Sequence, residues 1–195
     1  MHLAGLEDAD SLTCDAHKIL PVPMGAGMFF CRARRFVDAV FSVHPGYIPE
    51  GHPERDDAYQ HTLQWSRRCI GLKVFLTLAA FGSAGVAALV DRQTAMADRL
   101  RSALVTSGWR VTNTTPLPLV CFTREGLSAP DVERLARAVV DEGVVWISSV
   151  LLPDGRRWLR ACITNMDTGE DDIDGLVAAV NRVCAHLFPT ARAST

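Results

Sequence analysis

Apolar residues recur at helical spacing through the middle of the chain. The pattern covers residues 66–81 and then residues 85–107, so it predicts two successive amphipathic helices that bridge a domain boundary. A shorter helix is predicted over residues 34–40. Pro130 suits the first turn of a helix, and the acidic run at residues 170–172 suits the positive end of a last one. Helices are therefore expected in both halves of the chain.

Runs of β-branched and aromatic residues predict strands on both sides of the two central helices. The expected strands cover residues 11–14, 28–31, 109–115, 117–123, 143–151 and 157–164. The second half then has the order strand, strand, helix, strand, strand, helix, which favours a small α+β domain with an antiparallel sheet. The first half has too few strands to form a covered sheet alone, so we expect it to be part of a larger domain.

The apolar run at residues 74–90 approaches the length of a transmembrane helix. Gly82 and Gly85 interrupt this run, Lys73 lies at its edge, and charged residues follow it directly. We therefore expect a buried core helix that ends at a glycine, rather than a membrane span.

Composition narrows the classes of function. The 195 residues are 48% apolar with a formal net charge of -2, so the chain lacks the basic excess that binds nucleic acid. Its six cysteines form no CxxC pair and have no histidine at zinc-ligand spacing, so free, mostly buried thiols are expected and a metal site is not. The acidic residues near the start do not match a signal peptide, so a cytoplasmic location is expected.

The segment DSLTCDAHK, at residues 10–18, has the clearest chemical content. It places Lys18 beside His17 just before a turn rich in proline and glycine. An amine must be neutral to attack an aldehyde, so a lysine that forms a Schiff base needs partial burial and polar neighbours. Taken in isolation, an ordinary solvated lysine is the alternative.

This segment resembles the cofactor-lysine motif of group II pyridoxal-phosphate-dependent decarboxylases, the family of aromatic-amino-acid, glutamate and cysteine-sulfinate decarboxylases. Further matches follow in the family's order in the loop at residues 45–48, the helix at 66–82 and the strand at 159–165. The resemblance implies the α/β fold of fold-type I pyridoxal-phosphate enzymes. Residues 1–84 would then be the carboxyl-terminal part of the large cofactor-binding domain, and residues 85–195 a small α+β domain.

The resemblance also implies roles for individual residues. Lys18 would bind pyridoxal phosphate covalently, and His17 would lie against the cofactor near its phosphate. Asp15 and Ser11 are weaker candidates for the phosphate neighbourhood. Tyr47 matches the loop tyrosine that returns a proton to the substrate carbon after carbon dioxide leaves, which favours an amine over an aldehyde as product. The alternative for this residue is a tyrosine that packs within a turn.

Arg160 matches an arginine of the small domain that holds a substrate carboxylate in relatives, a role that suits a bidentate guanidinium. The alternative is a structural salt bridge at the domain interface. Ile19 departs from the family pattern, in which tryptophan or methionine often follows the lysine. The identity of the amino-acid substrate therefore stays open.

A larger departure precedes the lysine. The family's aspartate that pairs with the pyridine nitrogen, and most of its phosphate-binding residues, lie farther upstream than the seventeen residues found before Lys18. We therefore expect a decarboxylase half that needs a separately encoded amino-terminal half and assembles as a homo- or hetero-oligomer. Two alternatives stay open: a non-catalytic dimerisation or regulatory partner of an intact decarboxylase, and a fragment of a longer enzyme.

Overall fold

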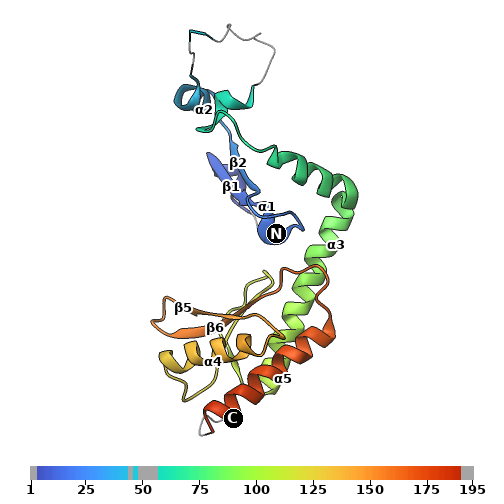
Figure 1. Ribbon diagram of the computed structural model, residues 1–195, viewed down its shortest axis with the longest axis vertical. Coiled ribbons are helices and arrows are strands. Elements are labelled where there is room, and N and C mark those ends of the chain that lie inside the picture. The colour runs from blue at the N-terminus through green and yellow to red at the C-terminus, as the bar shows by residue number, and fades with distance from the viewer. Residues whose placement is uncertain (1–3, 44–45, 48–56, 190–195) are drawn as a thin grey trace. The chain divides into compact units, whose positions relative to one another are not determined.

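The computed structural model describes residues 4–43, 46–47 and 57–189, which form two compact units (Figure 1). Unit 1 is Met1–Gly82 and unit 2 is Ser83–Thr195, so the division falls close to the boundary expected between residues 84 and 85. The elements in chain order are η1 (Leu6–Asp8), β1 (Ser11–Asp15), α1 (Ala16–Ile19), β2 (Gly27–Cys31), α2 (Arg34–Phe41), η2 (Ala58–His61), α3 (Ile70–Thr106), β3 (Arg110–Val111), β4 (Leu119–Thr123), α4 (Ala129–Asp141), β5 (Ser148–Leu151), β6 (Arg157–Cys162) and α5 (Glu170–Leu187).

Unit 1 is built on an antiparallel hairpin of β1 and β2, where the sequence predicts strands at residues 11–14 and 28–31. Ser11 pairs with Cys31 at one end of the hairpin, and Asp15 pairs with Gly27 at the other. A small apolar cluster lies at the second end. Its buried members and the half-buried residues packed on them are Ala16, Val22, Ala26, Leu20, Met28, Ile70 and Val74.

α3 joins the two central helices of the sequence prediction into one element with a kink at Gly82. The φ of 64° and ψ of 175° at this residue lie outside the helical region and suit a glycine. After the kink the helix buries one face through Leu89, Gln93, Ala97, Leu100 and Leu104.

Before the kink, every residue from Ile70 to Phe81 is exposed or half-buried. The most apolar window of α3 has a mean hydropathy of 1.8, and only 6% of it is buried. The prediction of a buried core helix is therefore wrong for this part of the described chain. By length and composition alone, α3 passes the test for a membrane-crossing helix, a test that core helices also pass.

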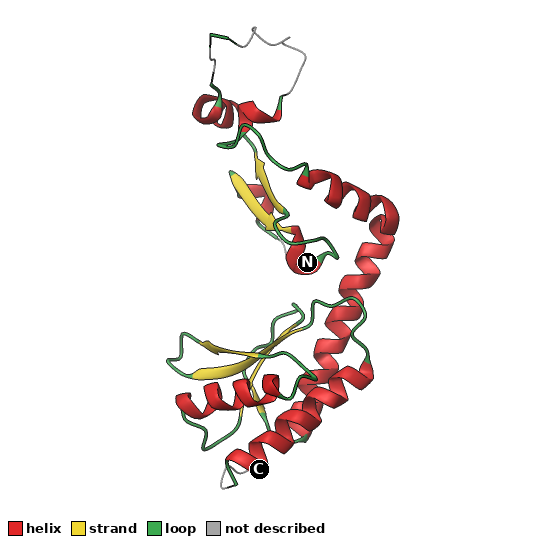
Figure 2. Cartoon of the chain, in the orientation of Figure 1, coloured by secondary structure: helices red, strands yellow, loops and turns green. Residues whose placement is uncertain are grey.

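Unit 2 is a four-stranded antiparallel sheet with helices packed on one face (Figure 2). The strand order is β3-β4-β6-β5. In the two central strands, Phe122 pairs with Leu159 and Val120 pairs with Ala161, so these side chains share one face of the sheet. They enter a core to which α3, α4 and α5 also contribute. This arrangement confirms the predicted α+β order of strands and helices.

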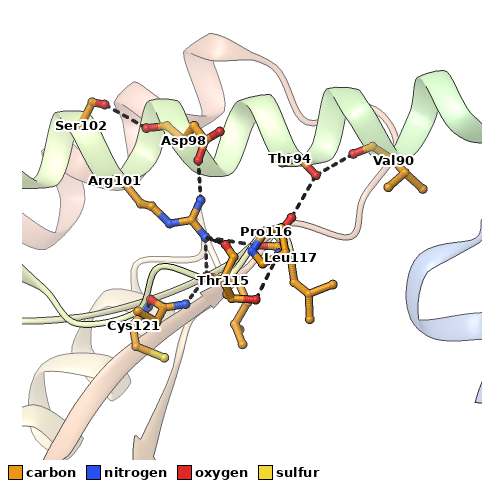
Figure 3. Close-up of polar contacts among 11 residues, drawn as sticks. Val90, Thr94, Asp98, Arg101, Ser102, Thr115, Pro116, Leu117 and Cys121 are labelled. Carbon is orange, nitrogen blue, oxygen red and sulfur yellow. Dashed lines mark hydrogen bonds and ion pairs between the residues drawn. The ribbon is translucent and has the colours of Figure 1, made fainter. Parts of the chain in front are cut away.

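The segment between β3 and β4 is held against α3 by one arginine (Figure 3). Nη2 of Arg101 donates to the carbonyls of Thr115, Leu117 and Leu119 at 3.0, 3.1 and 2.9 Å. Nη1 of the same guanidinium lies 2.6 Å from Asp98 Oδ1. The guanidinium thus links α3 to three backbone carbonyls before and at the start of β4, two of which also accept from the Leu119 N–H and from the Asn113 side chain.

β3 is much shorter than the strand predicted over residues 109–115. The Asn113 side chain donates to the Leu119 carbonyl at 2.6 Å and accepts from the Cys121 N–H at 2.7 Å. These bonds occupy backbone groups of β4 that a longer β3 would use, so the ladder ends at Val111.

All six cysteines are free, as expected, but the expectation that most are buried is wrong. Cys121 and Cys184 are buried, Cys31 is half-buried and the others are exposed. Burial raises the pKa of the Cys184 thiol, and the nearby Arg124 opposes this shift.

Candidate cofactor and substrate site

Lys18 lies in α1, the four-residue helix that directly follows β1. The Ala16 N–H donates to the Ala26 carbonyl at 2.9 Å, which closes the turn between the two strands. Gly25 has a φ of 90°, a conformation that glycine adopts without strain. The predicted chemical segment thus forms a short helical turn at one end of the hairpin.

Asp15 and Lys18 form an ion pair at this end of the hairpin. Asp15 Oδ2 and Lys18 Nζ are 2.6 Å apart, and their side chains are 43% and 69% exposed. The hydrogen bond and positive charge of Lys18 lower the pKa of the Asp15 carboxyl. The partial burial that a Schiff-base lysine needs is not provided by the described residues.

His17 is half-buried next to Lys18. Its Nδ1 lies 3.4 Å from the Ala26 carbonyl oxygen and donates to it in the tautomer that carries the proton there. Ser11 starts β1, about 13 Å along the strand from Asp15 at the usual rise per residue. The structure therefore brings Asp15, His17 and Lys18 together and leaves Ser11 at the other end of β1.

Tyr47 lies in a turn between α2 and η2 and is 78% exposed. Its predicted loop neighbours Pro45 and Ile48 fall outside the described residues. The elements that flank the loop meet where His61 Nδ1 lies 2.8 Å from Asp38 Oδ1. The exposure of Tyr47 is a poor fit to a tyrosine that packs within a turn.

Arg160 lies in β6, with Cys121 of β4 and Ser148 of β5 opposite it in register. Its neighbours Leu159 and Ala161 enter the core, so Arg160 lies on the sheet face away from the helices. It is half-buried, and its guanidinium forms no hydrogen bond or ion pair with another described residue.

Sequence reasoning missed the surroundings of two candidates. The register that places Cys121 and Ser148 beside Arg160 cannot be read from one sequence, because a shift by one residue would change every neighbour. Burial raises the pKa of the Cys121 thiol, and the charge of Arg160 opposes the shift. The contact of His17 with the Ala26 carbonyl depends on the backbone geometry of the turn. The proline and glycine residues predict that a turn is present but not its geometry.

A comparison with protein families gives one match that covers most of the chain. Residues 1–125 match the model of the "Pyridoxal-dependent decarboxylase conserved domain". This range includes Lys18, Tyr47 and the segment that runs through β4.

Individual relatives and solved structures point the same way. The chain is 25% identical to an aromatic-L-amino-acid decarboxylase of Bacillus atrophaeus over 88% of its own length and 38% of that protein. It is 27% identical to a 3,4-dihydroxyphenylacetaldehyde synthase of Drosophila melanogaster over 87% of its length and 34% of that protein. The crystal structure of Oryza sativa TDC with PLP and tryptamine matches with a TM-score of 0.84 and 19% identity, over 95% of this chain and 41% of that one.

These structural neighbours confirm the fold-type I α/β class that the sequence predicts. The chain spans about a third to two fifths of the length of these three proteins.

Proposed function

Because the chain belongs to the pyridoxal-dependent decarboxylase family, we propose that it forms the carboxyl-terminal part of an enzyme that converts an amino acid into an amine and carbon dioxide. The observation that carries this proposal is the position of Lys18, whose amine is exposed on the turn that follows β1. Pyridoxal phosphate is the cofactor of the family, and a lysine amine is the protein group that attaches it covalently.

The residues around Lys18 fit this cofactor in part. Lys18 offers the amine, and the half-buried His17 lies beside it. Asp15 pairs with the Lys18 ammonium, so attachment requires that this ion pair opens and that the amine loses its proton. Asp15 is the one ion-pair partner of Lys18 in the described residues, so contacts to the phosphate and the ring nitrogen have to come from elsewhere.

Three side chains of this chain serve the reaction. When bound, pyridoxal phosphate supplies an electron sink for the electron pair that is left on the α-carbon when the carboxylate departs. Arg160 binds a carboxylate of the substrate through its guanidinium. Tyr47 holds a proton on its hydroxyl and gives it to the α-carbon once carbon dioxide has left. Lys18 would hold the cofactor covalently through its amine when no substrate is bound.

We propose further that a separate chain supplies the amino-terminal half, in a cytoplasmic heteromeric enzyme. The support is that the match covers 41% of a solved relative, and that the described residues around Lys18 supply only the covalent attachment point. A non-catalytic partner role is the weaker hypothesis, because the chain retains a lysine at position 18 and a tyrosine at position 47, the residue types that the reaction needs.

The chain offers a sharp test of the Lys18 assignment, because Lys18 and Lys73 are its only lysines. The chain is mixed with pyridoxal phosphate and the amino-terminal segment of the same enzyme, reduced with borohydride and mapped by peptide mass spectrometry. We expect label on Lys18 and not on Lys73. Lys73→Arg keeps the label and Lys18→Arg loses it. Equal labelling of both lysines, or of neither, contradicts the proposal.

The product tests Tyr47 separately. Tyr47→Phe removes the proton donor and leaves the attachment point intact, so we expect Lys18 labelling to persist. In air we expect part of the product to shift from amine to aldehyde, with dissolved dioxygen as the oxidant and ammonia and hydrogen peroxide as the co-products. Liquid chromatography of both products measures the ratio. An unchanged amine yield would return Tyr47 to a structural role.

A further inference from the structure

The first half of α3 has apolar side chains around most of its circumference. Ile70 and Val74 pack on the small cluster of the hairpin. The other sides of the helix carry Leu72, Phe75 and Leu76, and Leu78 continues the stripe of Ile70 and Val74 one turn further on. All four of these leucine and phenylalanine side chains are exposed. Lys73 is the one charged residue from Ile70 to Phe81. A helix that is apolar on nearly all sides is stable only when it is buried.

The hairpin of β1 and β2 also has exposed apolar side chains on both of its faces. Phe29 and Phe30 are neighbours in β2, so their side chains point to opposite faces, and they are 56% and 53% exposed. Sheets with apolar side chains on both faces occur where helices cover both sides. A two-stranded hairpin also leaves the outer backbone groups of both strands unpaired, which favours the addition of further strands.

We infer that these residues form a docking surface for the amino-terminal part of the large domain of the same decarboxylase, an α/β segment that adds strands to the hairpin and helices to its faces. This inference rests on the proposed function. The unit 1 apolar surface consists of Phe29, Phe30, Leu72, Phe75, Leu76 and Leu78.

The length of the relatives identifies this occupant. The matching region is 41% of the solved relative, which leaves 59% (100% minus 41%) of such a chain to supply the missing layers. The described part of unit 1 supplies two strands and a small cluster with three buried residues, so its own core covers few of its apolar side chains.

A membrane is a poor alternative occupant, although α3 is apolar. The straight helix before the kink runs from Ile70 to Phe81, twelve residues that span about 18 Å at the helical rise. The hydrocarbon core of a bilayer is about 30 Å thick. The helix continues past Gly82 into a face that is buried in the core of unit 2.

Two matched variants of the full chain test the docking surface. Phe75→Glu places a charge on it at a side chain that is 65% exposed, so the chain alone keeps its fold. Val105→Glu is the control, because Val105 lies on the same helix, is 58% exposed and belongs to unit 2. The probe is the amino-terminal segment of the same enzyme, encoded in the same or an adjacent reading frame. Sedimentation velocity without pyridoxal phosphate measures its binding.

We expect Phe75→Glu to weaken the complex at least about tenfold, as for other charges placed in the centre of an interface, and Val105→Glu to leave it unchanged. Equal behaviour of the two variants overturns the inference. So does the absence of an amino-terminal segment from both reading frames, self-association of the chain that Phe75→Glu abolishes, or binding to phosphatidylcholine vesicles instead. A complex that forms and fails to label Lys18 supports the docking surface and contradicts the proposed function, so the two failures are distinguishable.

Discussion

The two units of this chain contain similar kinds of apolar residues and use them differently. Unit 2 buries twenty-one residues in one core, and five of its described large apolar side chains are exposed. Among its described residues, unit 1 buries three apolar ones in its cluster and exposes sixteen large ones. Hydrophobic burial is the main favourable term in folding, so unit 2 has its own driving force and unit 1 has little.

By this contrast, unit 2 has the features of a domain with its own core, and unit 1 has the features of a part of a domain. In unit 2 the apolar stripes of three helices face one sheet and form one core with it. In unit 1 the hairpin and the first half of α3 are apolar on several sides at once, which is the pattern of elements in the middle of a larger layered structure. The candidate chemistry of Lys18 lies in the incomplete unit.

Replacing one phenylalanine by alanine in each unit should give the largest difference in stability loss between the two units. Phe122 is fully buried, so Phe122→Ala should lower the free energy of unfolding by about 3–5 kcal/mol, while Phe29→Ala, at an exposed site, should change it by less than about 0.5 kcal/mol. Urea unfolding followed by the fluorescence of the buried Trp109 and Trp158 measures both. Similar losses in the two variants would show that unit 1 packs its phenylalanines as tightly as unit 2.

A smaller loss is expected at a polar contact inside unit 2. Asn181 Oδ1 accepts from Trp109 Nε1 at 2.8 Å and from Arg124 Nη2 at 3.0 Å. Asn181→Ala leaves the buried indole N–H without its acceptor, so unfolding should become easier by about 1–3 kcal/mol in the same urea experiment. Arg182→Ala is the control, because it removes only an exposed ion pair with Glu142. A smaller effect for Asn181 than for Arg182 would contradict this account of the core.

The smallest effect is expected at the start of α4. Ser128 and Asp131 form a capping box, and the Ser128 side-chain hydrogen bond lowers the pKa of the Asp131 carboxyl. Ser128→Ala should cost about 1 kcal/mol at neutral pH. The pKa of Asp131 in the folded state lies below the ordinary value of 3.8. The stability that its ionised carboxylate contributes is therefore fully present above pH 3.8, and it is lost as the pH falls through the pKa of the folded state. Urea unfolding at several pH values should show this loss in the parent and not in Asp131→Asn.

Much of unit 2 could be predicted from the sequence. The period of the apolar residues and the helix-start signals gave α4 and α5, and the apolar runs gave β4 and β6, because each element there packs against others in the same chain. The prediction was too long for β3, where the Asn113 side chain replaces strand pairing.

In unit 1 the sequence also predicted β1, β2 and α2 closely, and the error concerns the burial of the first part of α3, which finds few apolar partners among the described residues. The apolar run at residues 74–90 predicted a buried helix, and its first part is exposed. For the candidate site, the sequence placed Lys18 after a strand and beside His17. It gave no information on the ion pair with Asp15, because the spacing of these residues allows contact only when the backbone turns into a helix after β1.

Amide hydrogen exchange of the whole chain, read by mass spectrometry for each unit, tests the central claim most directly. Amides in stable cores exchange through global unfolding, and amides in elements without a core exchange through local opening. The account predicts strong protection in β4, β6 and α5, and exchange that is faster by orders of magnitude in β1, β2 and residues 70–81. Equal protection in both sets would show that unit 1 is a complete folding unit, and would contradict the claim that it is part of a larger domain.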